Sequence, residues 1–193
     1  MRWMWIDRVV ELVPGERMVA VKHVSLAEEH LHDHFPPTAH RAAFPVMPMS
    51  LIVEGMAQTG GVLVGHATGF GEKVILSKVS KAELEREAVP GDTLRYRAQL
   101  QSLGEPGASC LGIVELIRPV ARGAGEAVEI GRIDLMFSFA DRAADLRGAG
   151  LEMPEENFVF SEAFATLLRS SGIEDGPMPG AASGPAADRG HTT

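Results

Sequence analysis

The sequence predicts an α+β fold in which one long, buried helix is wrapped by a curved antiparallel β-sheet. Three observations support this prediction: a strand–turn–strand pattern over residues 2–24, an almost wholly apolar segment at residues 48–67, and four strand-like stretches between residues 73 and 140. Strand-like stretches bounded by turn residues, with side chains alternating at a period of two, are typical of an antiparallel sheet. One helix inside one curved sheet is the simplest arrangement of these elements.

The length and composition are those of a single folded domain. The chain has 193 residues, enough for a core that needs neither disulfides nor a structural metal. Its 18 basic and 26 acidic side chains give a net charge of -8, which argues against a nucleic-acid-binding or anionic-membrane-binding surface. The single cysteine, Cys110, cannot form an intrachain disulfide, so the cytoplasm is the expected compartment. The chain reaches Asp7 too soon for a signal-peptide core to precede it.

The first and last strands have the clearest patterns. Pro14-Gly15 separates two strand-like runs near the start of the chain, which predicts a β-hairpin. In the last run, residues 127–140, apolar side chains at every second position are expected to be buried on one face. They are Ile133, Leu135, Phe137 and Phe139.

The segment from Pro48 to Ala67 is predicted to be a helix that is buried on nearly all sides. Small residues such as Gly55 and Gly60 allow neighbouring groups to approach its backbone closely. Glu54 and Gln58 in its middle favour the interior of a protein over a bilayer. This helix is therefore the expected centre of the core.

The chain divides into three predicted parts. Residues 1–140 form the expected core domain, and residues 141–173 form an extension that carries a short helix. That helix is predicted from apolar side chains at helical spacing after Ser161, a residue type favoured at the N-cap. Residues 174–193 are rich in Gly, Ala, Pro and Ser, which predicts a flexible tail.

Glu54 is an acid on an otherwise apolar helix. Burial is expected to raise the pKa of its carboxyl group, which would allow it to donate a proton in catalysis. A second interpretation is equally open from the residues alone: Gln58, one helical turn later, hydrogen-bonds a purely structural glutamate.

His30, His32 and His34 alternate with other residues just before Phe35-Pro36. A metal site is disfavoured, because histidines on a strand or loop would point apart and no second cluster supplies further ligands. A histidine here is either structural or a general base that works with the buried acid.

Several motifs occur in an order that carries a family resemblance. They are Ile6-Asp7-Arg8-Val9, Pro14-Gly15, Lys22-His23-Val24-Ser25, Glu29, His34-Phe35-Pro36, Pro45-Val46-Met47-Pro48, Glu54-Gly55-Met56-Ala57-Gln58 and Val89-Pro90-Gly91-Asp92. Over residues 3–140 the chain resembles the 3-hydroxyacyl-(acyl-carrier-protein) dehydratases of bacterial fatty-acid synthesis, of the non-isomerising type with a catalytic glutamate. The resemblance implies a hot-dog fold and homodimers that can assemble into hexamers as trimers of dimers.

The resemblance also implies dehydration of 3-hydroxyacyl thioesters on acyl carrier protein to trans-2-enoyl thioesters, without a metal or other cofactor. His34 would remove the proton alpha to the carbonyl, and Glu54 of the partner subunit would protonate the leaving hydroxyl. The backbone N–H of Met49 would polarise the thioester carbonyl. Gln58 would brace the helix in a supporting role. The other expected substrate-binding residues are Phe35 and Pro48.

Three features depart from the family pattern. Met49 and Asp33 stand where the family has glycine, and the Met49 side chain could narrow the channel. An insertion at Pro37–Phe44 is either a lid or tunnel wall, with His40 or Arg41 at the substrate, or a surface loop, which we favour. The C-terminal extension is the third departure, and we assign it no chemical role.

An acidic carrier protein needs a basic landing site. Lys73, Lys78, Lys81 and Arg86 are candidates, but the glutamates between them equally predict a mixed, solvated strand. Two alternative functions also stay open. One is another hot-dog reaction on acyl thioesters, either hydrolysis or CoA-linked hydration, and the other is a non-catalytic acyl-binding or assembly subunit.

Overall fold

The structure is a computed structural model that describes residues 4–120, 123–140, 157 and 159–173. Its elements in chain order are β1 (Arg8–Val13), β2 (Arg17–His23), α1 (His30–Asp33), α2 (Met49–Ala67), β3 (Val74–Leu84), β4 (Thr93–Gly104), β5 (Gly107–Val120), β6 (Gly123–Phe139) and α4 (Glu162–Ser170). The predicted tail at residues 174–193 and most of the predicted extension lie outside the described residues. The division into three parts stays a prediction.

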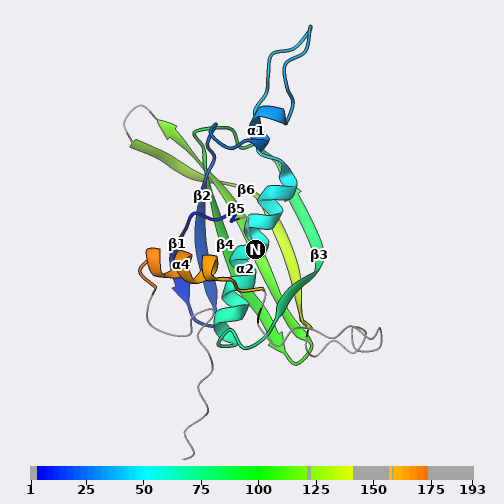
Figure 1. Ribbon diagram of the computed structural model, residues 1–193, viewed down its shortest axis with the longest axis vertical. Coiled ribbons are helices and arrows are strands. Elements are labelled where there is room, and N and C mark those ends of the chain that lie inside the picture. Colours follow the sequence, from blue (N-terminus) through cyan, green and yellow to red (C-terminus); the bar gives the residue numbers. More distant parts are fainter. Residues whose placement is uncertain (1–3, 121–122, 141–156, 158, 174–193) are drawn as a thin grey trace, which may run out of the picture.

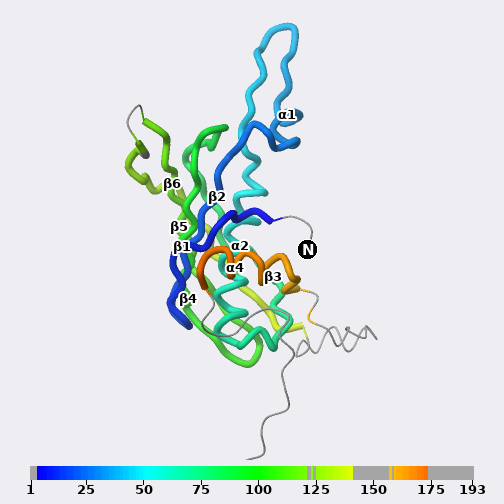
Figure 2. Tube along the Cα trace, turned by 60° about the vertical axis from the view of Figure 1, so that its left-hand side comes forward, coloured from blue at the N-terminus to red at the C-terminus, as the bar shows by residue number. Residues whose placement is uncertain are grey.

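The six strands form one antiparallel sheet in the order β1-β2-β4-β5-β6-β3. The sheet curves around α2, which runs along one face of it and contacts five of the six strands, β2 to β6 (Figure 1). Figure 2 shows the same wrapping from the side. This arrangement confirms the predicted α+β class and hot-dog fold.

The turn between β1 and β2 is set by a glycine. Gly15 has φ +70°, a left-handed conformation that residues with a Cβ rarely adopt. The N–H of Glu16 donates to the carbonyl of Val13 at 3.1 Å and closes the turn. The predicted hairpin is confirmed.

The alternating pattern in β6 is also confirmed. Ile133, Leu135, Phe137 and Phe139 are all buried, whereas Met136 between them is exposed. A residue on a strand points to the opposite face from its neighbours, so one set of side chains packs on α2 and the other faces outward.

The predicted central helix is α2, and its glycines mark where neighbours approach it. A Cβ on Gly55 would lie 2.6 Å from the Tyr96 hydroxyl, and one on Gly60 would lie 3.2 Å from the Phe137 ring. At Gly65 the ring of Phe160 occupies the space of a side chain. Aromatic rings from other parts of the chain therefore occupy the space that side chains on these glycines would fill. This allows the helix and the sheet to pack at a short distance.

The predicted helix in the extension is α4, which contacts β1 and lies beside α2 (Figures 1 and 2). Ser161 is the N-cap, as predicted, although its hydroxyl makes no capping hydrogen bond. At the other end of α4, the Ser171 hydroxyl oxygen accepts a hydrogen bond of 3.0 Å from the N–H of Val9 in β1. The side chain of Ser171 thus provides the hydrogen-bond partner for one backbone N–H group at the β1 edge of the sheet.

The histidine run forms a helical turn, α1, and not the strand or loop expected from its alternation. Leu31 is fully buried, and the N–H of His34 donates to the carbonyl of His30 at 3.1 Å. Burying the one apolar side chain of the run favours the turn over an extended chain.

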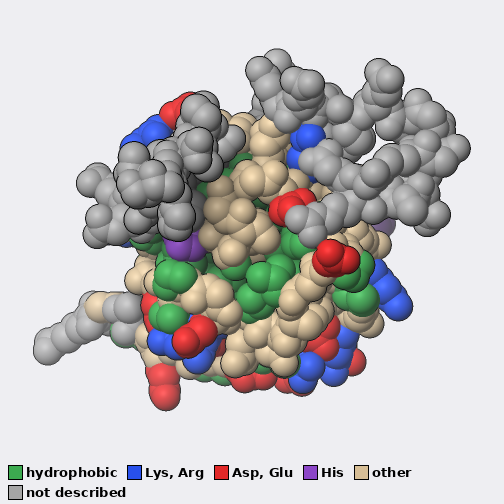
Figure 3. Space-filling view, turned by 90° about the horizontal axis from the view of Figure 1, so that it is seen from below, with side chains coloured by type: hydrophobic (Ala, Val, Ile, Leu, Met, Phe, Trp, Pro, Cys, Tyr) green, Lys and Arg blue, Asp and Glu red, His purple; other side chains and the backbone are tan. Residues whose placement is uncertain are grey.

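The four candidate landing residues do not form one exposed basic patch. Of the four candidate landing residues, Lys73 is buried and Lys81 pairs with Glu83 at 2.9 Å, whereas Lys78 and Arg86 are exposed. The face seen from the end opposite α1 intermixes acidic and basic side chains (Figure 3). Within the described residues, no helix has both the length and the apolar character needed to cross a bilayer.

Two glycines of α2 allow a matched test of the packing. In Gly55→Ala the new methyl group would collide with the buried Tyr96 ring, so we expect the free energy of unfolding to fall by about 1–3 kcal/mol. In Gly61→Ala the methyl group meets only the Phe137 ring at 3.7 Å, an ordinary contact. Better helix propensity should then raise stability by about 1 kcal/mol. Thermal unfolding of both variants measures the difference, and equal melting temperatures would contradict this packing.

Cys110 offers a second test of the core. It is buried, and burial raises the pKa of its thiol to about 12. We expect no reaction with a colorimetric thiol reagent at pH 8 in the native protein and complete reaction in denaturant, because only an exposed thiolate attacks. Prompt labelling of the folded chain would show that β5 is more open than the structure has it.

Candidate functional site

A groove of about 730 Å³ lies at the start of α2. Its walls come from the segment after α1, the first residues of α2, and the chain between β3 and β4. Lining residues include His34, Phe35, Met49, Ile52, Arg86 and Arg118. Two of the predicted substrate-binding residues, Phe35 and Met49, thus share this groove with the predicted base.

A backbone hydrogen-bond partner selects one tautomer of the neutral His34 ring. Its Nδ1 lies 2.5 Å from the carbonyl oxygen of Val46. A carbonyl can only accept a hydrogen bond, so Nδ1 carries the proton and Nε2 keeps a free lone pair in the neutral ring. His34 is half-buried, so that nitrogen can serve as a base toward a ligand in the groove.

The backbone next to His34 is strained. Phe35 has φ +57°, an uncommon conformation for a residue with a bulky side chain. Its ring packs 4.3 Å from the His34 ring, and the Arg41 guanidinium lies 5.4 Å from the centre of the Phe35 ring. The N–H of Phe44 donates to the Phe35 carbonyl at 3.0 Å. Strain of this kind is commonly found at functional sites.

The insertion projects away from the body of the fold. Residues 35–45 form an extended loop beyond the end of α2 (Figures 1 and 2). His40 and Arg41 are both exposed, and Arg41 donates to the Pro36 carbonyl at 3.3 Å. Phe44 at the base of the loop lines the groove. The loop therefore combines an exposed tip with a base that forms part of the groove wall.

The start of α2 provides backbone donors. Pro48 is the N-cap, and its carbonyl accepts hydrogen bonds from the N–H groups of Leu51 and Ile52 at 3.0 and 3.3 Å. Among the described residues the N–H of Met49 has no such bond. A free N–H at the positive end of a helix of this length can stabilise negative charge. Pro48 itself is not among the residues that line the groove, and its role in substrate binding stays a prediction.

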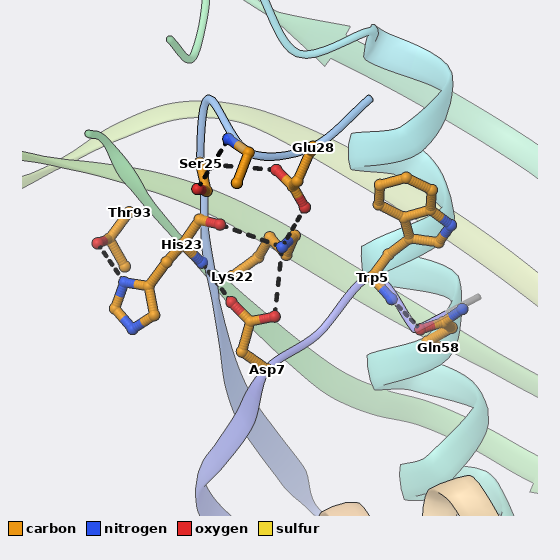
Figure 4. A network of polar contacts seen from close by, with 9 residues as sticks. Trp5, Asp7, Lys22, His23, Ser25, Glu28, Gln58 and Thr93 are labelled. Atoms are coloured by element: carbon orange, nitrogen blue, oxygen red, sulfur yellow. Dashed lines mark hydrogen bonds and ion pairs between the residues drawn. The ribbon is translucent and has the colours of Figure 1, made fainter. Parts of the chain in front are cut away.

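Glu54 and Gln58 form a pair on α2. The Gln58 side-chain N–H₂ donates to Glu54 Oε1 at 2.9 Å, and Gln58 Oε1 accepts from the N–H of Trp5 at 2.8 Å. Figure 4 shows Gln58 between the helix and the N-terminal segment. Gln58 is buried, whereas Glu54 is half-buried in the single chain. The Trp5 contact fixes which end of the Gln58 amide faces the acid.

The structure does not bring His34 and Glu54 into one cavity of the same chain. His34 lines the groove, and Glu54 lines a separate cavity of about 110 Å³ along α2. Neither of these two cavities of the single chain is therefore lined by both residues.

The other histidines of the run have different surroundings. His32 Nε2 lies 2.7 Å from the carbonyl of Leu26, on an exposed side of α1. Burial lowers the pKa of His30, which packs edge-on against Trp5. Among the described residues, no group of three or more His, Cys, Asp or Glu side chains is placed to hold a metal ion.

A buried ion-pair network supports the segment that leads to α1, and sequence reasoning missed it. The ammonium of Lys22 is almost fully buried between Glu28 at 2.6 Å and Asp7 at 3.3 Å (Figure 4). Asp7 also accepts from the N–H of His23 at 2.6 Å. Breaking a buried pair of this kind typically costs about 3–5 kcal/mol. The motif residues Asp7 and Lys22 were the available signal, but sequence alone does not show that they meet.

Sequence reasoning also missed the aromatic wall of the Glu54 cavity. Val159, Phe160 and Phe164 line it from the C-terminal segment. Their helical spacing was visible in the sequence, but nothing local indicated which part of the core they would meet.

Comparison with known proteins places the chain in a family. Residues 2–117 match the model of the FabA-like domain. A 3-hydroxyacyl-(acyl-carrier-protein) dehydratase FabZ of Granulibacter bethesdensis is 41% identical over 97 residues, covering 49% of this chain and 54% of the relative. One from Acidiphilium cryptum is 46% identical over 93 residues, covering 47% and 53%. The match thus spans about half the length of these curated relatives.

Solved structures are less similar. An acyl-CoA hydrolase from Agrobacterium tumefaciens has a TM-score of 0.49 at 15% identity, covering 66% of this chain and 44% of that one. An acyl-CoA hydrolase from Bacillus cereus has a TM-score of 0.49 at 12% identity, covering 64% and 65%. Similarity at this level assigns neither an activity nor a ligand. The match to the family model extends over more than half of the chain, and the protein belongs to the FabA-like domain family.

Proposed function

We propose that the protein dehydrates 3-hydroxyacyl thioesters, carried on acyl carrier protein, to trans-2-enoyl thioesters. Membership of the FabA-like family and the names of the FabZ relatives support this activity. The observation that carries it is the hydrogen bond between His34 Nδ1 and the Val46 carbonyl, because in the neutral ring it directs the lone pair to Nε2, beside a groove that ends at a helix N-terminus.

In the proposed reaction, His34 Nε2 takes the proton from the carbon alpha to the thioester carbonyl. The electrons of that C–H bond form the new carbon–carbon double bond as the bond from the beta carbon to the hydroxyl oxygen breaks. The hydroxyl leaves as water after accepting a proton from Glu54. One proton then passes from the imidazolium to the Glu54 carboxylate through solvent, which restores both groups.

Gln58 supports the acid by positioning it. With the Gln58 amide bonded to Glu54 Oε1, Oε2 is the oxygen that carries and delivers the proton. The N–H of Trp5 holds the amide oxygen away from the acid, so the arrangement cannot flip without losing a hydrogen bond.

The negative charge that develops on the thioester oxygen needs a donor. The N–H of Met49 at the start of α2 is suited to this, since it lies at the positive end of the helix dipole and its residue lines the groove. The methionine retains this N–H, and its half-exposed side chain forms part of the groove wall.

The site is completed, in this proposal, by a homodimer in which His34 faces Glu54 of the partner subunit. The β3 edge is the suitable contact, because it is 11 residues long and carries the exposed apolar side chains of Leu76 and Val79. At the other edge, β1 already receives Ser171. Assembly of three such dimers into a hexamer, and a cytoplasmic location, belong to the same proposal.

Arg86 is the candidate contact for an acidic carrier protein. It is exposed and lines the groove that holds His34. Arg118, also at the groove, is engaged by Asp92 at 3.3 Å and by the Glu87 carbonyl at 3.1 Å. We therefore expect Arg86 to contribute more to docking than the lysines of β3.

The first prediction concerns the two proton-transfer groups. His34→Ala and Glu54→Gln should each lower the rate of hydration of a short 2-enoyl thioester by about 10²- to 10⁴-fold, because each removes a general acid or base. His32→Ala is the matched control, since His32 is exposed and outside the groove, and it should retain activity. Release of free thiol by the unaltered protein would instead indicate a hydrolase. Absence of turnover on every chain length would favour a non-catalytic subunit.

The second prediction concerns sharing of the site between chains. Co-expressed His34→Ala and Glu54→Gln chains should recover about a quarter of wild-type activity, because half of the dimers are mixed and each mixed dimer has one intact site of two. Each variant expressed alone provides the baseline. If the mixture stays at that baseline while differently tagged chains co-purify, both groups must act within one chain and the dimeric site is wrong.

A further inference from the structure

The cavity at Glu54 is apolar apart from two residues. Glu54 and Gln58 are its polar members, and the rest of its lining is aliphatic or aromatic. Ala57, Gly61 and Val62 come from α2, and Leu76 comes from the β3 edge. A small apolar cavity that begins at an acid is suited to a hydrocarbon chain whose polar end reacts at that acid.

Part of this lining comes from the C-terminal segment, beyond residues 2–117 that match the family model. The rings of Phe160 and Phe164 are both buried, and they pack edge-to-face at 5.9 Å. Phe160 in turn packs edge-to-face against Phe70 at 4.9 Å and fills the space above Gly65. The wall is therefore a fixed aromatic stack and not a mobile surface side chain.

Hydrogen bonds hold this segment in place. The Asn157 side-chain N–H₂ donates to the carbonyls of Phe70 and Glu72 at 2.9 and 3.0 Å, just after the end of α2. Its Oδ1 accepts from the N–H of Val159 at 3.2 Å. At the far end of α4, Ser171 receives the Val9 N–H. The segment is thus anchored on both sides of Phe160 and Phe164.

We propose that Phe160 and Phe164 determine acyl-chain length by closing the far end of the Glu54 cavity. This inference rests on the proposed function, since it takes the cavity as the place where the acyl chain of the thioester lies. Each methylene that enters apolar surroundings should improve affinity about fourfold. The gain stops when the chain reaches the aromatic stack, so the protein favours short chains over long ones.

The test is binding of S-alkyl pantetheine thioethers of increasing chain length, measured by calorimetry on the full chain. With the unaltered protein, affinity should rise about fourfold per methylene and then level off or fall. In Phe164→Ala the rise should continue to longer chains. Phe164→Leu should shift the limit in the same direction by less, and it serves if the alanine variant does not fold.

Leu168→Ala is the matched control. Leu168 lies on α4 one turn after Phe164 and is fully buried, but it does not line the cavity. Its truncation should lower the melting temperature while leaving the chain-length limit unchanged. A shift equal to that of Phe164→Ala would mean that loosening of α4, and not the ring, sets the limit, which overturns the proposal.

Three other outcomes are decisive. An unchanged limit in folded Phe164→Ala and Phe164→Leu overturns the proposal, as does failure of the unaltered protein to bind any thioether of the series. Binding with the expected shift but no hydration of 2-enoyl thioesters would sink the proposed activity and leave the chain-length role standing. Binding and turnover are thus read out separately.

Discussion

The burial requirement of α2 shapes the rest of the molecule. The helix is apolar on nearly all sides, so any face left open to water would cost free energy in proportion to its area. The sheet covers one side, and glycines at Gly55, Gly60 and Gly65 let aromatic rings lie directly on the helix backbone. A buried polar group on such a helix costs free energy unless it has a hydrogen-bond partner. Glu54 and Gln58 satisfy this through each other and through the N-terminal segment.

Local patterns were sufficient to predict most of the fold. The Pro14-Gly15 turn, the two-residue period of β6 and the extent of α2 depend on short-range chemistry, and each matches the structure. Local signals failed where tertiary contacts decide. The histidine run is helical because Leu31 is buried. Lys73 is buried because other parts of the fold cover it.

The candidate site was predictable in its residues but not in its geometry. His34 and Glu54 could be recognised in the sequence as residues able to transfer protons. In the structure each has a hydrogen-bond partner, the Val46 carbonyl for His34 and the Gln58 amide for Glu54. Their placement in separate cavities follows from the topology of one chain, which sequence spacing does not encode. The aromatic wall comes from the opposite end of the sequence, so its contact with α2 is a long-range one that no local pattern reveals.

The bond between His34 and Val46 spans the whole loop, since one residue precedes it and the other follows it. The Phe35–Phe44 backbone bond closes the same stem one step further out. The position of the His34 imidazole is therefore fixed by the two ends of the loop and does not depend on the path of the loop between them. Lengthening a closed loop adds little entropic cost, growing only with the logarithm of its size. A change in the number of residues in this loop would therefore leave the tautomer of His34 unchanged, because the Val46 carbonyl lies at the stem of the loop.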